Sequence, residues 1–105
     1  METLKEVDYL ELQSLYREHD VVVAIAHTPT CGTCIVAKKM LIIIKETLKN
    51  VPIVQINLNY NEKMSIDYEI LSVPCILIYK NSKCVEKIYA FESIPFLYKK
   101  ITSYL

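Results

Sequence analysis

Residues 21–26, Val-Val-Val-Ala-Ile-Ala, are continuously apolar and rich in β-branched side chains. The run is too short for a typical helix, and β-branched residues favour strands. A strand without polar positions has to be covered on both faces, as in sheets that carry helices on each side. Thr28-Pro29-Thr30 breaks the run. The sequence therefore predicts a buried central strand in an α/β protein.

A long helix is predicted directly after this strand. From Cys31 onward, apolar or small side chains recur at helical spacing, and Asn50 and Pro52 supply stop signals. The recurring residues are Cys34, Ala37, Met40, Leu41, Ile44 and Leu48. Alternating side chains over residues 54–58 predict a second strand, followed by a short polar helix that ends near residue 70. The order of strand, helix and strand implies parallel pairing.

The first residues of the chain are predicted to form a helix. Leu4, Val7, Leu10 and Leu15 lie near helical spacing. Thr3 and Glu6 together fit a capping box. We therefore expect an amphipathic helix from Thr3 to about Arg17.

The last third of the chain predicts a hairpin and a closing helix. Residues 75–79 and 85–89 are strand-like, and the residues between them favour an antiparallel connection. Ser93 can cap the final helix. That helix would place four apolar residues against the sheet: Phe96, Leu97, Ile101 and Leu105.

These elements predict one α/β domain over residues 1–105, with a central mixed sheet of four to five strands and helices on both faces. Twelve basic and twelve acidic residues balance, which argues against nucleic-acid or anionic membrane partners. The longest aliphatic stretch, residues 40–44, is far too short to span a bilayer, and the N-terminus lacks an apolar signal core. We expect a cytoplasmic monomer.

The segment Cys31-Gly32-Thr33-Cys34 lies where the buried strand gives way to the long helix. Free amide groups and the macrodipole at a helix start stabilise an anion. We therefore expect Cys31 to be a thiolate nucleophile with a depressed pKa. Cys34, one turn further on, is spaced to close a disulfide and to resolve a mixed disulfide with a substrate.

A metal site and an inert buried pair are the two other interpretations of these cysteines. Zinc usually requires a second closely spaced cysteine pair or a histidine pair. Cys75 and Cys84 are widely spaced and fall in the predicted hairpin. A Cys-X-X-Cys pair in a strand–helix–strand context is typical of redox chemistry, so no metal site is predicted.

The chain resembles the thioredoxin family along nearly its whole length. The agreement includes Thr30-Cys31-Gly32-Thr33-Cys34 after a hydrophobic strand and Ser72-Val73-Pro74 before the hairpin. The resemblance implies a thioredoxin fold and a function in reducing protein disulfides. It also implies no bound cofactor beyond the redox-active pair Cys31–Cys34, and recharging by a thioredoxin-reductase-type donor, an NADPH-linked flavoprotein.

The same resemblance implies a substrate groove around the cysteine pair. The Val73–Pro74 peptide bond is expected to be cis and to form one wall. Another wall would contain Thr30, Gly32 and Thr33, with Ala90 and Phe91 below. Extended substrate backbone could pair with Val73.

Several positions depart from the family pattern and mark a divergent, thioredoxin-like protein. Thr30 replaces a tryptophan, Thr33 a proline, Ile25 a buried acid, Gln55 a lysine, and Ser82 and Ala90 two glycines. The missing acid is one that assists proton removal from the resolving cysteine in the family. The loss of this acid and of the flanking tryptophan leaves a second hypothesis open, a binding module that captures a partner with little turnover.

Two further residues, His27 and Cys75, could act near the cysteine pair. His27 lies four residues before Cys31 and could influence a thiolate, although a satisfied histidine at a strand end is the simpler interpretation. Cys75 could approach Cys31, although it also fits a small buried hydrophobic residue. Lys38-Lys39 and Lys99-Lys100 are expected on solvated helix faces.

Overall fold

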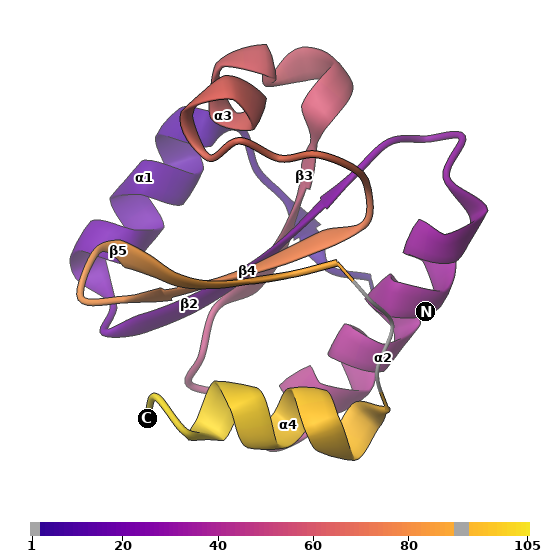
Figure 1. Cartoon of the computed structure of the whole chain (residues 1–105). Coiled ribbons are helices and arrows are strands. Elements are labelled where there is room, and N and C mark those ends of the chain that lie inside the picture. Colours follow the sequence, from indigo (N-terminus) through magenta and orange to yellow (C-terminus); the bar gives the residue numbers. More distant parts are fainter. Residues whose placement is uncertain (1–2, 90–92) are drawn as a thin grey trace.

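A five-stranded sheet of order β1-β3-β2-β4-β5 runs through the computed structural model, which describes residues 3–89 and 93–105 (Figure 1). The strands are β1 (Lys5–Glu6), β2 (Val21–His27), β3 (Ile53–Asn57), β4 (Cys75–Lys80) and β5 (Lys83–Ile88). β3 pairs parallel with both β1 and β2, while β4 pairs antiparallel with β2 and β5. This mixed sheet confirms the predicted α/β fold, with β1 as its fifth strand.

Helices cover both faces of the sheet. They are α1 (Tyr9–Glu18), α2 (Gly32–Thr47), the 3-10 helix η1 (Leu58–Tyr60), α3 (Glu62–Asp67) and α4 (Ile94–Thr102). Figure 1 shows α1 and α3 on one side of the sheet and α2 and α4 on the other. The sheet is therefore the middle layer of three.

Strand β2 lies in the centre of the sheet, and all seven of its residues are buried. Val21, Val23 and Ile25 pack into the apolar cluster beneath α2 and α4. Val22 and Ala24, which alternate with them, pack into the cluster beneath α1. A strand buried on both faces needs apolar side chains at every position, which is why this run lacks the usual polar alternation.

The N-terminal segment differs from the predicted helix. Residues 5–6 form strand β1, and the backbone N–H of Val7 still donates to the carbonyl of Gln55 at 2.9 Å. Leu4 and Val7 are buried on opposite faces of the sheet, which a strand segment allows because its side chains alternate. The prediction that Thr3 and Glu6 form the capping box was wrong. The box joins Asp8 and Glu11.

This capping box gives a stability prediction. The Asp8 carboxylate accepts from the Glu11 backbone N–H at 2.8 Å, and the Glu11 carboxylate accepts from the Asp8 N–H at 3.2 Å. Asp8→Ala removes the first bond and should lower the free energy of unfolding by about 1 kcal/mol, measured by urea denaturation. Ser14→Ala, at an exposed position in the same helix, serves as the control. Equal stabilities of the two variants would contradict this role for Asp8.

The C-terminal elements follow the prediction closely. The hairpin turns at Asn81 and Ser82, both with positive φ, which matches the twist of the flanking strands. The Ser93 hydroxyl accepts from the Phe96 N–H at 3.2 Å and caps α4. Two of the four residues expected against the sheet are buried, Leu97 and Ile101. The prediction was wrong for Phe96 and Leu105, which are exposed. Phe96 directly precedes Leu97 and therefore points to a different side of α4, and Leu105 lies beyond the helix end.

Candidate functional site

The cysteine pair lies at the edge of the sheet where β2 ends. Helix α2 begins at Gly32, and Cys31 is its N-cap residue. Strand β4 starts at the same edge, because Ala26 of β2 pairs with Cys75 antiparallel. The residues that follow β2 and those that precede β4 are therefore neighbours. The Val73–Pro74 bond at this edge is cis, which confirms the expectation for that bond.

Cys31 and Cys34 form a disulfide, with their Cα atoms 5.3 Å apart. The two sulfur atoms differ in environment, since Cys31 is partly exposed whereas Cys34 is 1% exposed. The backbone N–H of Cys34 donates to the Cys31 sulfur at 3.2 Å, and the Thr33 hydroxyl lies 3.5 Å from the same atom. An accessible sulfur that accepts from a backbone N–H and lies beside a hydroxyl is suited to carry negative charge.

Selective alkylation is the first expected consequence. Burial raises the pKa of Cys75 to about 11 and also raises the pKa of Cys84. In the reduced protein near pH 7, iodoacetamide should therefore label Cys31 much faster than Cys34, Cys75 or Cys84. Peptide mapping by mass spectrometry measures the four rates. Equal rates, or fastest labelling at Cys84, would contradict the assignment of Cys31 as nucleophile.

The Thr33 hydroxyl gives a second prediction. A donor beside the Cys31 sulfur favours the thiolate and hence the reduced form. Proline at this position in the first helical turn is tolerated but offers no donor. Thr33→Pro should therefore make the reduction potential more negative, with about 30 mV for every 1.4 kcal/mol of lost stabilisation. Titration in glutathione buffers measures both proteins, and an unchanged or less negative value for the variant would refute this role.

Five of the other residues expected in the groove are among those the structure describes, and they lie near this edge of the sheet. Thr30, Gly32 and Thr33 are exposed, Val73 is half-buried and Pro74 is buried. A Cβ atom at Gly32 would meet nothing within 4 Å, so packing does not require glycine there. Ala90 and Phe91 lie outside the described residues. The assignment of these residues to groove walls stays a prediction.

Cys75 is fully buried, and its side chain belongs to the cluster on the α1 face of the sheet. Helix α2 covers the opposite face, so Cys75 points away from the layer beneath that helix. Its place in the structure agrees with a small buried hydrophobic residue.

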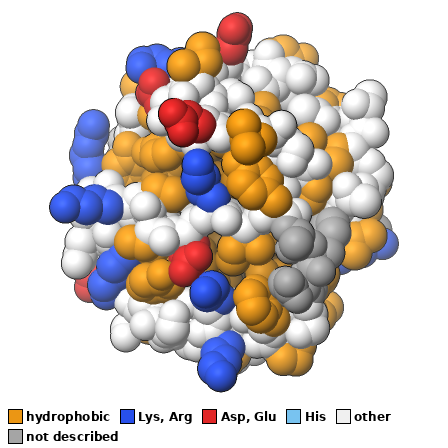
Figure 2. Space-filling view, viewed as in Figure 1, with side chains coloured by type: hydrophobic (Ala, Val, Ile, Leu, Met, Phe, Trp, Pro, Cys, Tyr) orange, Lys and Arg blue, Asp and Glu red, His pale blue; other side chains and the backbone are white. Residues whose placement is uncertain are grey.

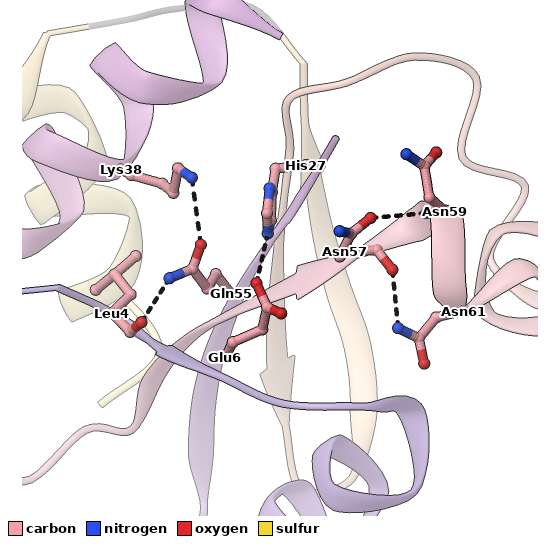
Figure 3. Close-up of polar contacts among 8 residues, drawn as sticks. All are labelled: Leu4, Glu6, His27, Lys38, Gln55, Asn57, Asn59 and Asn61. Carbon is pink, nitrogen blue, oxygen red and sulfur yellow. Dashed lines mark hydrogen bonds and ion pairs between the residues drawn. The ribbon is translucent and has the colours of Figure 1, made fainter. Parts of the chain in front are cut away.

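A layer of polar side chains lies between the sheet and α2 (Figure 3). His27 Nε2 is 3.3 Å from Glu6 Oε1, an ion-pair distance. The Lys38 ammonium donates to Gln55 Oε1 at 3.3 Å, and Gln55 Nε2 donates to the carbonyl of Leu4 at 2.6 Å. Burial and the charge of Lys38 lower the pKa of His27, and Glu6 opposes that shift.

Sequence reasoning missed two members of this layer. Glu6 was assigned to a helix, and Lys38 was expected on a solvated helix face rather than bonded to Gln55. One signal could have located Lys38, because residues four apart share a helix face and Lys38 follows Cys34 by four. Glu6 gave no comparable local signal, since its contact with His27 arises from strand pairing.

Residues 3–89 and 93–105 contain no helix of the length and hydrophobicity that crossing a bilayer requires. Within the same ranges, no three side chains among His, Cys, Asp and Glu gather as metal ligands.

The fold and the disulfide at the start of α2 define a thioredoxin-fold protein with a Cys-X-X-Cys redox pair. The thioredoxin family model matches residues 4–103. The thioredoxin-like protein YusE of Bacillus subtilis (strain 168) is 44% identical over 98 residues, covering 93% of this chain and 91% of that protein. The chain belongs to the thioredoxin family.

Solved structures agree with the fold. Mitochondrial thioredoxin 3 of Saccharomyces cerevisiae, in its oxidised form, superimposes with a TM-score of 0.85 at 18% identity, over 95% of this chain and 94% of that one. Thioredoxin of Plasmodium falciparum gives a TM-score of 0.86 at 18% identity, over 97% and 100% of the two chains. Family membership and the disulfide-forming pair together indicate thiol–disulfide oxidoreductase chemistry.

Proposed function

We propose that this protein reduces disulfide bonds in other proteins. The observation that carries the proposal is the asymmetry of the pair, with a partly exposed Cys31 at a helix start and a buried Cys34 bonded to it. In the reduced state, the Cys31 thiolate attacks a substrate disulfide and releases one substrate thiolate. Cys34 then attacks Cys31, releases the second substrate thiolate and leaves the Cys31–Cys34 disulfide.

The surface around Cys31 supports a protein as the substrate. Residues 28–36 carry no charged side chain, and Ile35 and Val36 are each 53% exposed. Figure 2 shows one face of the molecule, on which Lys, Arg, Asp and Glu side chains lie among hydrophobic ones. An uncharged, partly apolar segment beside Cys31 suits contact with a polypeptide better than with a small charged disulfide.

The electron donor in this proposal is an NADPH-linked flavoprotein of the thioredoxin-reductase type, and the protein itself holds no further cofactor. It acts as a cytoplasmic monomer. Membership of the thioredoxin family supports this class of substrate and of electron donor.

A coupled assay with thioredoxin reductase, NADPH and insulin as the protein disulfide tests the proposal. Insulin reduction over many turnovers, with matching NADPH consumption, is the expected result. A Cys31→Ser variant should show none. Stoichiometric capture without turnover would instead favour the binding module.

A further inference from the structure

His27 is a buried polar side chain that the proposed steps leave without a role. It is 5% exposed and ends β2 at the sheet edge where α2 begins. Neither ring nitrogen makes a hydrogen bond of acceptable geometry with the residues described. Burying an imidazole without hydrogen bonds is costly, so its presence here needs an explanation.

His27 and the resolving cysteine face the same layer of the protein. Alternation along β2 puts His27 on the side of Val23 and Ile25, which pack beneath α2. On α2, Cys34 is buried in the first turn, and Lys38 lies one turn further on the same face. Lys38 reaches Gln55 in this layer and acts on His27 through its charge.

Glu6 completes the arrangement from the other side of the imidazole. Its carboxylate oxygen is 3.3 Å from Nε2 of His27, as drawn in Figure 3. A carboxylate at this distance stabilises an imidazolium more than a neutral ring. Glu6 of β1 and Lys38 of α2 are the charged groups that act on the ring within the described chain, and they act in opposite directions.

We propose that His27 accepts the proton of the Cys34 thiol when Cys34 attacks the mixed disulfide, and that Glu6 stabilises the imidazolium formed. This inference rests on the proposed function. In this step the thiol proton passes to His27, and the Cys34 thiolate forms a bond to the Cys31 sulfur. The bond between Cys31 and the substrate sulfur breaks, and the departing thiolate takes up a proton from the imidazolium.

The charges around the ring fit this role near neutral pH. Burial and Lys38 keep the pKa of His27 below its ordinary value, so the ring is neutral and able to accept a proton. A positioned general base accelerates such a step by about 10²–10⁴-fold.

The test follows 4,4′-dithiodipyridine reacting with the reduced protein in a Cys75→Ala/Cys84→Ser background. Attack by Cys31 releases the first equivalent of thiopyridone, and resolution by Cys34 releases the second. His27→Gln should leave the first phase nearly unchanged and slow the second about tenfold or more at pH 7. The difference in second-phase rate between wild type and His27→Gln should shrink as the pH approaches the ordinary thiol pKa of about 8.5. His19→Gln, at an exposed position, is the matched control.

The pH profile separates this role from a structural one. The rate of the second phase should fall at acidic pH, with a midpoint at the pKa of His27. NMR titration of the His27 ring measures that pKa independently. Glu6→Gln should move both the kinetic limb and the NMR titration to lower pH, and Lys38→Met should move both to higher pH.

Three outcomes would overturn the role of His27 or the proposed function. An unchanged second phase in His27→Gln after a normal first phase overturns the role of His27 alone. A kinetic limb that does not follow the NMR titration in the Glu6 and Lys38 variants overturns it as well. A wild-type protein whose Cys31 releases no first equivalent overturns the proposed function and this inference together.

Discussion

Replacing Cys34 by serine should convert the protein into a trap for its substrates. Cys31 keeps its helix-start position and should still attack, but no neighbouring thiol can displace the substrate. Mixed disulfides should therefore accumulate as reductant-sensitive adducts on non-reducing gels. Turnover should fall by on the order of 10³-fold or more, because effective molarities of well-placed intramolecular groups reach about 10⁵ M and millimolar external thiol cannot match them.

Two variants control this experiment. Cys31→Ser should trap nothing, which separates attack at the site from incidental oxidation at Cys84. Cys34→Ser/Cys75→Ser should trap at least as much as the single variant, since Cys75 is buried on the opposite face of the sheet from α2. Full turnover in this double variant would mean that resolution uses an external thiol instead of Cys34.

Leu41→Ala should cause the largest loss of stability among simple core substitutions in α2. Leu41 is 0% exposed and packs in the cluster with Ile25, Ile78 and Leu97. Truncation removes apolar burial and leaves a cavity, which together cost about 2–5 kcal/mol. The free energy of unfolding from urea denaturation of the reduced protein gives the value.

The same helix provides a matched control. Ile43, two residues later, is 54% exposed, and Ile43→Ala should change the unfolding free energy far less. Comparable losses in the two variants would mean that α2 does not pack on the sheet through the face assigned here.

The central part of the fold could be predicted because its signals are local. Strand β2, the helix after it and the hairpin each follow from patterns within about sixteen residues. Strand β1 could not be predicted in this way. It is two residues long and is defined by pairing with β3, about fifty positions further along the chain. The apolar residues on either side of it, Leu4 and Val7, are three apart and fit a helix equally well on sequence alone.

The same difference between local signals and long-range contacts applies to the candidate site. The cysteine pair, its place at a helix start and the cis bond before β4 were predicted from two short motifs. The polar layer was not, because Glu6, His27, Lys38 and Gln55 come from four different elements. Only the strand register and the packing of α2 bring these side chains together.

The double pairing of β2 also restricts where this chain can change in length during evolution. β2 is held in register by β3 on one side and by β4 on the other. One residue inserted within β2 would turn His27 to the other face, because side chains alternate along a strand. The Asn81–Ser82 turn joins β4 and β5 at the opposite end from Cys75, so residues added there leave the pairing of β2 intact. Insertions and deletions should therefore be tolerated at the hairpin turn and selected against beside the cysteine pair.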